Sequence, residues 1–83
     1  VGHIQLTIIS PTRGSAITEQ MRATGYAVTE IFGRGKSGTV TILHVGVKRK
    51  EVSDVETLIL EVDPQAFITM EDVRTVRRGF SRS

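Results

Sequence analysis

The order in which strand-like and helix-like segments follow one another limits the fold of this chain more than any other feature. Residues 4–8 alternate apolar and polar side chains with a period of two, which is typical of a half-buried strand. Residues 26–32 and 40–47 are rich in β-branched and aromatic side chains, and residues 66–70 have the same character. The sequence therefore predicts four strands.

Two segments between these strands have helical spacing. Ile17 and Met21 lie four residues apart after Ser15, a suitable N-cap, and Gly25 is expected to end this first helix. Residues 51–63 form the clearer helix, which Pro64 ends. The apolar face of this second helix consists of Val52, Val55, Ile59 and Val62.

In chain order these segments are strand, helix, strand, strand, helix, strand, which is the split βαβ pattern. We therefore predict an α+β protein with the ferredoxin-like βαββαβ fold, a sandwich in which two helices cover one face of a four-stranded antiparallel sheet. The chain has 83 residues, the size of one small domain. We expect residues 1–83 to form a single domain with a small core.

The third predicted strand indicates that both faces of the sheet are apolar. Leu43, Val45 and Val47 point to one side, while Val40 and Ile42 point to the other. Since helices cover only one face, we expect the other face to bury its apolar side chains by self-association. The alternative is that Val40 and Ile42 lie near an end of the sheet and are half exposed.

Several kinds of site are excluded by what the sequence lacks. The chain has no Cys, and its two histidines, His3 and His44, lie on predicted strands where ordinary surface or interface positions are expected. We therefore predict no metal site and no cofactor. No Ser-His-Asp arrangement or other nucleophile motif can be argued, so we predict that the protein is not an enzyme. No apolar run approaches the ~20 residues that cross a bilayer, and the chain as given is expected to be soluble.

Basic residues gather at the C-terminus. The formal net charge is +2, yet residues 74–83 hold four arginines and no acid, which leaves −2 on the other 73 residues. A solvated tail is the simplest interpretation of these arginines. Contact with the phosphates of a ligand held by a neighbouring subunit, or binding of nucleic acid or anionic lipid, are the alternatives.

A glycine-rich segment, residues 33–38, separates the second and third predicted strands. It matches G-x-G-x-x-G, but a strand follows it where a dinucleotide-binding or P-loop motif needs a helix, and the chain lacks the other motifs of a protein kinase. We expect a flexible basic loop. Glycines can let successive backbone N–H groups converge on an anion, and Arg34, Lys36 and Ser37 add charge and a further donor. The loop could therefore hold a phosphate or carboxylate, or be a solvated hairpin tip.

Together these segments carry a resemblance to a known family. The matching motifs are Gly2-His3-Ile4, Gly25-Tyr26-Ala27-Val28-Thr29, the glycine-rich segment, Val47-Lys48-Arg49-Lys50 and Val62-Asp63-Pro64-Gln65-Ala66-Phe67-Ile68. The chain resembles the small uncharacterised cytosolic domain at the C-terminus of bacterial YitT-type membrane proteins and of related short multi-spanning membrane proteins. The block from Asp63 to Phe67 is the most specific part of the likeness.

The resemblance implies a PII-like version of the ferredoxin-like fold and a place at the cytoplasmic face of the membrane, where the domain follows its own N-terminal membrane region. It would also explain why the chain begins at Val1 without Met. The family supplies no established activity and no catalytic residues. PII-like proteins as a class are trimers that bind nucleotides or other small anions near the loop joining the second and third strands, so a homo-oligomer, with a trimer favoured, is implied.

The resulting hypothesis is a regulatory, ligand-sensing domain that binds a phosphorylated small molecule such as a nucleotide. The expected ligand-binding residues are Gly33, Arg34, Gly35, Lys36, Ser37, Gly38, Arg77 and Arg78. The first alternative is a structural module that oligomerises its membrane partner and binds nothing. Nucleic-acid binding through the arginine-rich C-terminus is the second alternative and is not expected.

Overall fold

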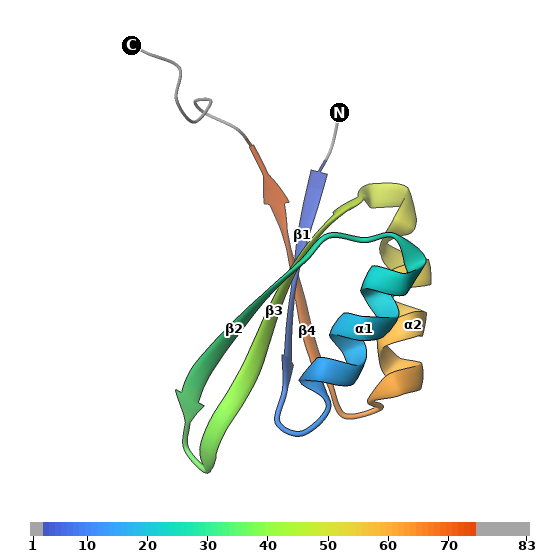
Figure 1. Cartoon of the computed structure of the whole chain (residues 1–83). Coiled ribbons are helices and arrows are strands. Elements are labelled where there is room, and N and C mark those ends of the chain that lie inside the picture. The colour runs from blue at the N-terminus through green and yellow to red at the C-terminus, as the bar shows by residue number, and fades with distance from the viewer. Residues whose placement is uncertain (1–2, 75–83) are drawn as a thin grey trace.

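The protein is described from a computed structural model, which describes residues 3–74. Two helices lie side by side on one face of a twisted sheet, and within residues 3–74 the other face carries no helix (Figure 1). The elements are β1 (His3–Ser10), α1 (Gly14–Thr24), β2 (Val28–Gly35), β3 (Gly38–Lys48), a 3-10 turn η1 (Arg49–Glu51), α2 (Val52–Val62) and β4 (Phe67–Val73). The predicted βαββαβ order is confirmed.

The four strands form one sheet in the order β2-β3-β1-β4, and every neighbouring pair is antiparallel. Strands β2 and β4 are therefore the edges. Because β1 lies between β3 and β4, and each helix connects two strands across the sheet, the topology is that of the predicted ferredoxin-like sandwich.

The core lies between the sheet and the helices. Alternate residues of β1 and β3 point toward the helices, so Ile4 pairs with Val47, Leu6 with Val45 and Ile8 with Leu43 in register. The buried apolar residues of the other elements are Ile17, Met21, Val28, Val55 and Ile59. The helical face predicted for residues 51–63 is confirmed, with Val55 and Ile59 fully buried and Val52 and Val62 partly buried.

Helix α1 ends as predicted but begins earlier than predicted. Gly25 adopts a left-handed conformation (φ 106°), and the N–H groups of Gly25 and Tyr26 donate to the carbonyls of Arg22 and Met21. The prediction of Ser15 as N-cap was wrong, because the helix already begins at Gly14 after Arg13. The Arg13 N–H donates to the Ser10 hydroxyl 2.9 Å away, so this serine supports the turn into the helix.

Strand boundaries differ from the predictions mainly at glycine and polar residues. Strands β2 and β3 continue through the glycine-rich segment to Gly35 and from Gly38, because glycine accepts an extended backbone as readily as a turn. Strand β4 runs on to Val73, since pairing with β1 overrides the polar character of Glu71 and Asp72. Within residues 3–74, neither helix has the length and hydropathy needed to cross a bilayer.

Candidate ligand-binding site

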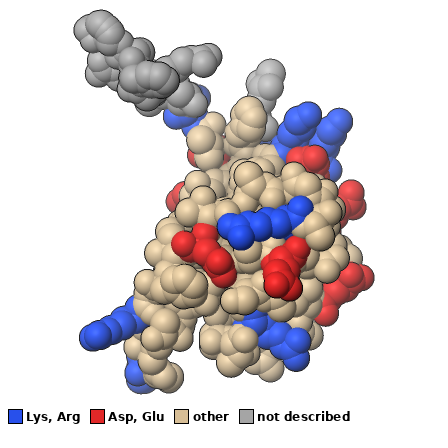
Figure 2. All heavy atoms as spheres, in the orientation of Figure 1, with Lys and Arg blue, Asp and Glu red and all other residues tan. Residues whose placement is uncertain are grey.

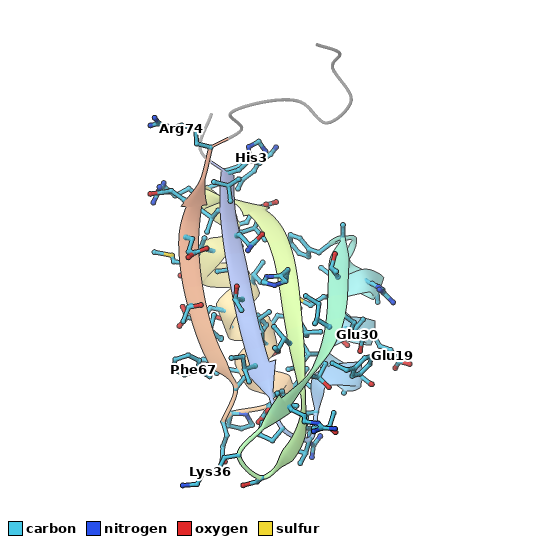
Figure 3. The ribbon with its side chains drawn as sticks, turned by 90° about the vertical axis from the view of Figure 1, so that its left-hand side faces the viewer. His3, Glu19, Glu30, Lys36, Phe67 and Arg74 are labelled. Atoms are coloured by element: carbon cyan, nitrogen blue, oxygen red, sulfur yellow. The ribbon has the colours of Figure 1, made fainter. Side chains whose placement is uncertain are left out.

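The predicted glycine-rich loop is the end of a β-hairpin. Gly35 pairs with Gly38, so the turn between β2 and β3 consists only of Lys36 and Ser37. The hairpin extends past the ends of β1 and β4, with Lys36 at its tip (Figures 1 and 3). The expected flexible loop is therefore corrected to an ordered strand pair with a two-residue turn.

This geometry changes how the segment could bind an anion. Of the glycines in this segment only Gly38 has a positive φ (126°), while Gly33 and Gly35 lie in extended strand. Successive N–H groups of a strand point to alternate sides, so they do not converge on one anion as in a glycine-rich cradle. An anion at the hairpin would depend on the side chains of Arg34, Lys36 and Ser37.

The electrostatic setting of the hairpin is simple. Arg34 and Lys36 are exposed, and on the face seen in Figure 2 no acidic side chain lies beside the basic ones at the hairpin end. Among residues 3–74 the ion pair found is that of Arg49 with Asp72, which joins η1 to the far end of β4. The two hairpin cations are therefore available to an anionic partner.

The other two predicted ligand residues, Arg77 and Arg78, lie outside the described residues. Arg74, which precedes them, sits at the end of the sheet opposite Lys36 (Figure 3). Val73 of β4 pairs with His3 of β1, and His3 pairs with Lys48 of β3. Lys48 lies ten residues along β3 from Gly38, so the hairpin turn and the end of β4 are about 33 Å apart along the sheet. The hairpin and the end of β4 therefore lie at opposite ends of the sheet.

The face of the sheet without helices carries a row of apolar side chains across all four strands. In register these are Ile31 of β2, Ile42 of β3, Ile9 of β1 and Phe67 of β4. The prediction that Ile42 faces away from the helices is confirmed, and so is the prediction that both faces are apolar. The row could not be read from the sequence, because it depends on the register of three strand pairs. We call these four residues the open-face row.

A polar row lies beside the open-face row. It consists of Thr29, His44, Thr7 and Thr69, and the Thr7 hydroxyl and His44 Nδ1 are 3.2 Å apart. His3 lies on the same face at the end of β1. In the part of the chain that the structure describes, no group of three or more potential metal ligands comes together.

A pocket that the sequence did not indicate lies between α2 and the edge strand β4. Its volume is about 260 Å³, and Leu6, Val52, Glu56, Ile68, Thr69 and Met70 line it. Four of these six residues are apolar. Thr69 also lines the pocket, although the register of β4 places its side chain on the opposite face of the sheet. The pocket therefore reaches the backbone of β4 at this residue. We call it the α2–β4 pocket.

The surroundings of Tyr26 raise its pKa, at a place away from these sites. Desolvation raises the pKa of Tyr26 above its ordinary value, and the negative charges of Glu51 and Asp54 raise it further. Tyr26 precedes β2 at the end opposite the hairpin, so this shift does not concern the candidate anion site.

Curated relatives are longer than this chain. A UPF0316 protein of Acetivibrio thermocellus is 31% identical over 83 residues, which are all of this chain and 40% of that protein. A UPF0316 protein of Alkaliphilus oremlandii is 35% identical over 80 residues, 96% of this chain and 46% of that protein. The chain thus spans less than half the length of these relatives.

Solved structures with this fold include PII-like proteins. A putative PII-like signaling protein from Thermus thermophilus has a TM-score of 0.70 at 18% identity and covers 88% of each chain. CPII from Thiomonas intermedia, solved bound to ADP, AMP and acetate, has a TM-score of 0.67 at 14% identity, covering 89% of this chain and 90% of its own. These likenesses confirm the predicted PII-like, ferredoxin-like fold.

A solved structure of a protein from an uncharacterised bacterial family is similar as well. It is the protein from Eubacterium ventriosum described as "Uncharacterized Protein Conserved in Bacteria DUF2179", with a TM-score of 0.69, 22% identity, and 83% of this chain and 97% of its own covered. Residues 26–78 of this chain match the same family, "Uncharacterized protein conserved in bacteria (DUF2179)". Since this match spans more than half of the 83 residues, the chain belongs to the DUF2179 family.

Proposed function

We propose that this domain is a regulatory, ligand-sensing module that self-associates and binds a phosphorylated small molecule, nucleotide-like in its chemistry, at the β2–β3 hairpin. The observation that carries the proposal is the pair of exposed cations, Arg34 and Lys36, at the end of a hairpin in a PII-like fold. The similar CPII structure is bound to ADP and AMP, which supports a nucleotide as the first candidate. We propose no catalytic activity for the domain.

The ligand proposal is tested by thermal unfolding in the presence of ADP, AMP, ATP, a cyclic dinucleotide and inorganic phosphate. A ligand at one hundred times its dissociation constant adds about 2.7 kcal/mol to the free energy of unfolding. In a domain of this size each kcal/mol raises Tm by about 4–8 °C. We expect at least one nucleotide to give such a rise and inorganic phosphate to give less.

A double variant locates the binding site. Arg34→Ala with Lys36→Ala should abolish the nucleotide-dependent rise in Tm, because it removes both cations of the hairpin. Lys48→Ala with Lys50→Ala is the matched control, since it removes two exposed cations from the opposite end of β3 and should leave the rise intact. The mass of each variant is measured as well, so that lost assembly is distinguished from lost binding. A nucleotide response that survives the hairpin variant would place the ligand elsewhere.

Self-association is supported by the open-face row. Its four side chains form an apolar band across the whole sheet, and Ile31 and Phe67 at its two ends are 41% and 61% exposed. An apolar band of this kind marks an interaction surface. We propose a trimer in solution, and Ile9→Asp, which places a charge in the middle of the band, should lower the mass measured by light scattering to that of the 9.1 kDa monomer.

The same row favours a second candidate function, a structural module that oligomerises its parent protein and binds no ligand. That module would give an oligomer by light scattering and no change in Tm with any nucleotide. We also propose that the additional length of the relatives includes a membrane region and that this domain lies on its cytoplasmic side. Membrane fractionation of the full-length protein and protease accessibility from the cytoplasmic side test that arrangement.

A further inference from the structure

Large exposed apolar side chains in residues 3–74 lie on the two edge strands. They are Ile31 and Phe32 on β2 and Phe67, Met70 and Val73 on β4. Edge strands present unpaired backbone groups and are normally protected by charged side chains, Pro or bulges. Neither β2 nor β4 contains Pro or Lys, and although each strand holds two charged residues, residues 67–70 carry no charge. The first half of β4 is therefore the edge segment that is least protected against pairing with another chain.

Phe32 forms a projecting knob on one of these edges. It pairs with Thr41, which pairs with the fully buried Ser10, so Phe32 points to the helix side of the sheet. Helix α1 does not reach over it, and 66% of its surface is exposed. An aromatic ring so placed gains a large apolar area when it is buried by a partner.

The α2–β4 pocket is a matching hole at the other edge and on the same side of the sheet. Its apolar lining comes from Leu6, Val52, Ile68 and Met70. An apolar cavity of ~150 Å³ in a protein accepts benzene, so a pocket of about 260 Å³ has room for a phenyl ring. Met70 at its mouth is 56% exposed, which leaves the pocket open to an incoming side chain.

We propose that Phe32 of one copy inserts into the α2–β4 pocket of a second copy, whose β4 pairs antiparallel with the incoming β2. This inference rests on the self-association in the proposed function and specifies its interface. The occupant is a second copy because this chain itself carries both an uncovered strand edge and an aromatic side chain on the required side. This contact, which we call the joint, combines main-chain hydrogen bonds between two edge strands with burial of the Phe32 side chain in a pocket.

The charges beside the knob and the hole are complementary on one side of Phe32. Glu30 and Arg34 flank Phe32 on the same side of β2. In an antiparallel pairing Arg34 approaches Glu56 at the rim of the pocket, so opposite charges meet there. Glu30 is directed toward the end of β4, where Arg49 and Asp72 already neutralise each other. The charge match therefore comes from Arg34 and Glu56.

A contact between two different surfaces of the same chain is head-to-tail, and such contacts satisfy every copy only when they close into a ring. Each copy then donates one Phe32 and fills one pocket. The ring also brings the hairpin of one copy against the beginning of β4 in the next, so that a ligand at the hairpin lies between copies. The trimer of the proposed function is one such closed ring.

Two single variants and their mixture test the joint by light scattering. Phe32→Asp removes the knob and keeps the hole, whereas Met70→Glu blocks the hole and keeps the knob. Both side chains are exposed, so we expect each variant to fold, which circular dichroism checks, and to be monomeric. Mixed at the highest soluble concentration, the two should form a heterodimer with one intact joint. Ala23→Asp, an exposed charge on α1, is the control and should keep the wild-type mass.

Each other result overturns the inference in a distinguishable way. If the wild type is an oligomer and Phe32→Asp and Met70→Glu keep its mass, or if their mixture stays monomeric, the joint is wrong and the open-face row remains the candidate interface. If the wild type is itself monomeric, the self-association in the proposed function fails too. The milder variant Phe32→Ala should raise the dissociation constant at least about thirtyfold, as an aromatic hot spot does.

Discussion

Gly14 at the start of α1 shows how one residue sets the distance between a helix and the sheet. A Cβ atom at this position would overlap the Thr41 side chain of β3. We predict that Gly14→Ala lowers the free energy of unfolding by about 1–3 kcal/mol, because either the helix or the strand must shift to make room. Urea denaturation measures this change.

Gly46→Ala is the matched control for that substitution. Gly46 also lies on β3, but no atom comes within 4 Å of the Cβ position, so the added methyl group meets open space. The stability of this variant should stay within about 0.5 kcal/mol of the wild type. An equal loss in both variants would show that the cost at Gly14 arises from the backbone and not from contact with Thr41.

Ser10 and Asp63 connect the end of β1 to the end of α2 through a buried hydrogen bond. The Ser10 hydroxyl donates to Asp63 Oδ2 at 2.7 Å, and Asp63 Oδ1 accepts from the Gln65 N–H at 2.9 Å. Since Ser10 and Asp63 are 0% and 7% exposed, an unpaired group here cannot turn to water. We predict that Asp63→Ala costs about 1–3 kcal/mol of unfolding free energy.

A double-mutant cycle with Ser10→Ala isolates the bond between these two side chains. The loss of unfolding free energy in the double variant should be smaller than the sum of the two single losses, with a coupling of about 0.5–3 kcal/mol. The reason is that the second substitution removes a side chain that has already lost its hydrogen-bond partner. Strictly additive losses would mean that the two residues act independently. Together with the bond from the Gln65 N–H, this bond holds Asp63 in the turn that leads through Pro64 into β4.

At the scale of elements, α2 is held by a narrow apolar face. Ile59 is fully buried in the core, while its neighbour Leu60 is only half-buried and takes no part in the core cluster. We predict that Ile59→Ala lowers the unfolding free energy by about 2–5 kcal/mol. Leu60→Ala removes a side chain of the same size from the adjacent position and should cost less than half as much. Thermal or urea unfolding distinguishes the two, and similar losses would contradict the assignment of the core face.

The elements that the sequence predicted well are those in which the spacing of apolar residues shows which face is buried. Residues 51–63 repeat apolar side chains at helical spacing, and residues 4–8 alternate cleanly, because each buries a single face. The hairpin was misjudged at residues 33–38, because glycine carries no side chain to report a strand and cross-strand pairing decides its conformation. The alternation of a strand already places Phe67 and Met70 on opposite faces, but which of these faces the helices cover depends on the register with β1.

The candidate site was predicted in composition but not in geometry. Arg34 and Lys36 could be recognised as cations beside glycines, whereas the absence of a backbone cradle follows from the extended conformation of Gly33 and Gly35. The α2–β4 pocket joins Leu6, Val52 and Met70, which are far apart in the sequence, and no local pattern can report such a meeting. Long-range register is thus the information that single-sequence reasoning lacks here.

At the scale of the whole molecule, the proposed self-association would cover the exposed apolar side chains of residues 3–74. A domain of this size buries only about 60% of its unfolded surface, so its core is small and association adds stability. The open-face row and the two edges would be covered together in a closed ring. The hairpin cations lie at one end of such a ring, and Arg74 at the end of β4 lies at the other.

Ligand binding and assembly should therefore depend on each other. If the ligand lies between the hairpin of one copy and the start of β4 in the next, a monomer presents only half of the site. We predict that Phe32→Ala, which adds no charge beside Arg34, weakens nucleotide binding at least about tenfold at concentrations where it is monomeric, and that the nucleotide in turn strengthens assembly of the wild type by the same factor. Titration calorimetry measures the first effect, and light scattering of a dilution series with and without nucleotide measures the second. Unchanged nucleotide affinity in monomeric Phe32→Ala would show that the site is complete within one copy, in which case the hairpin binds its ligand without help from the ring.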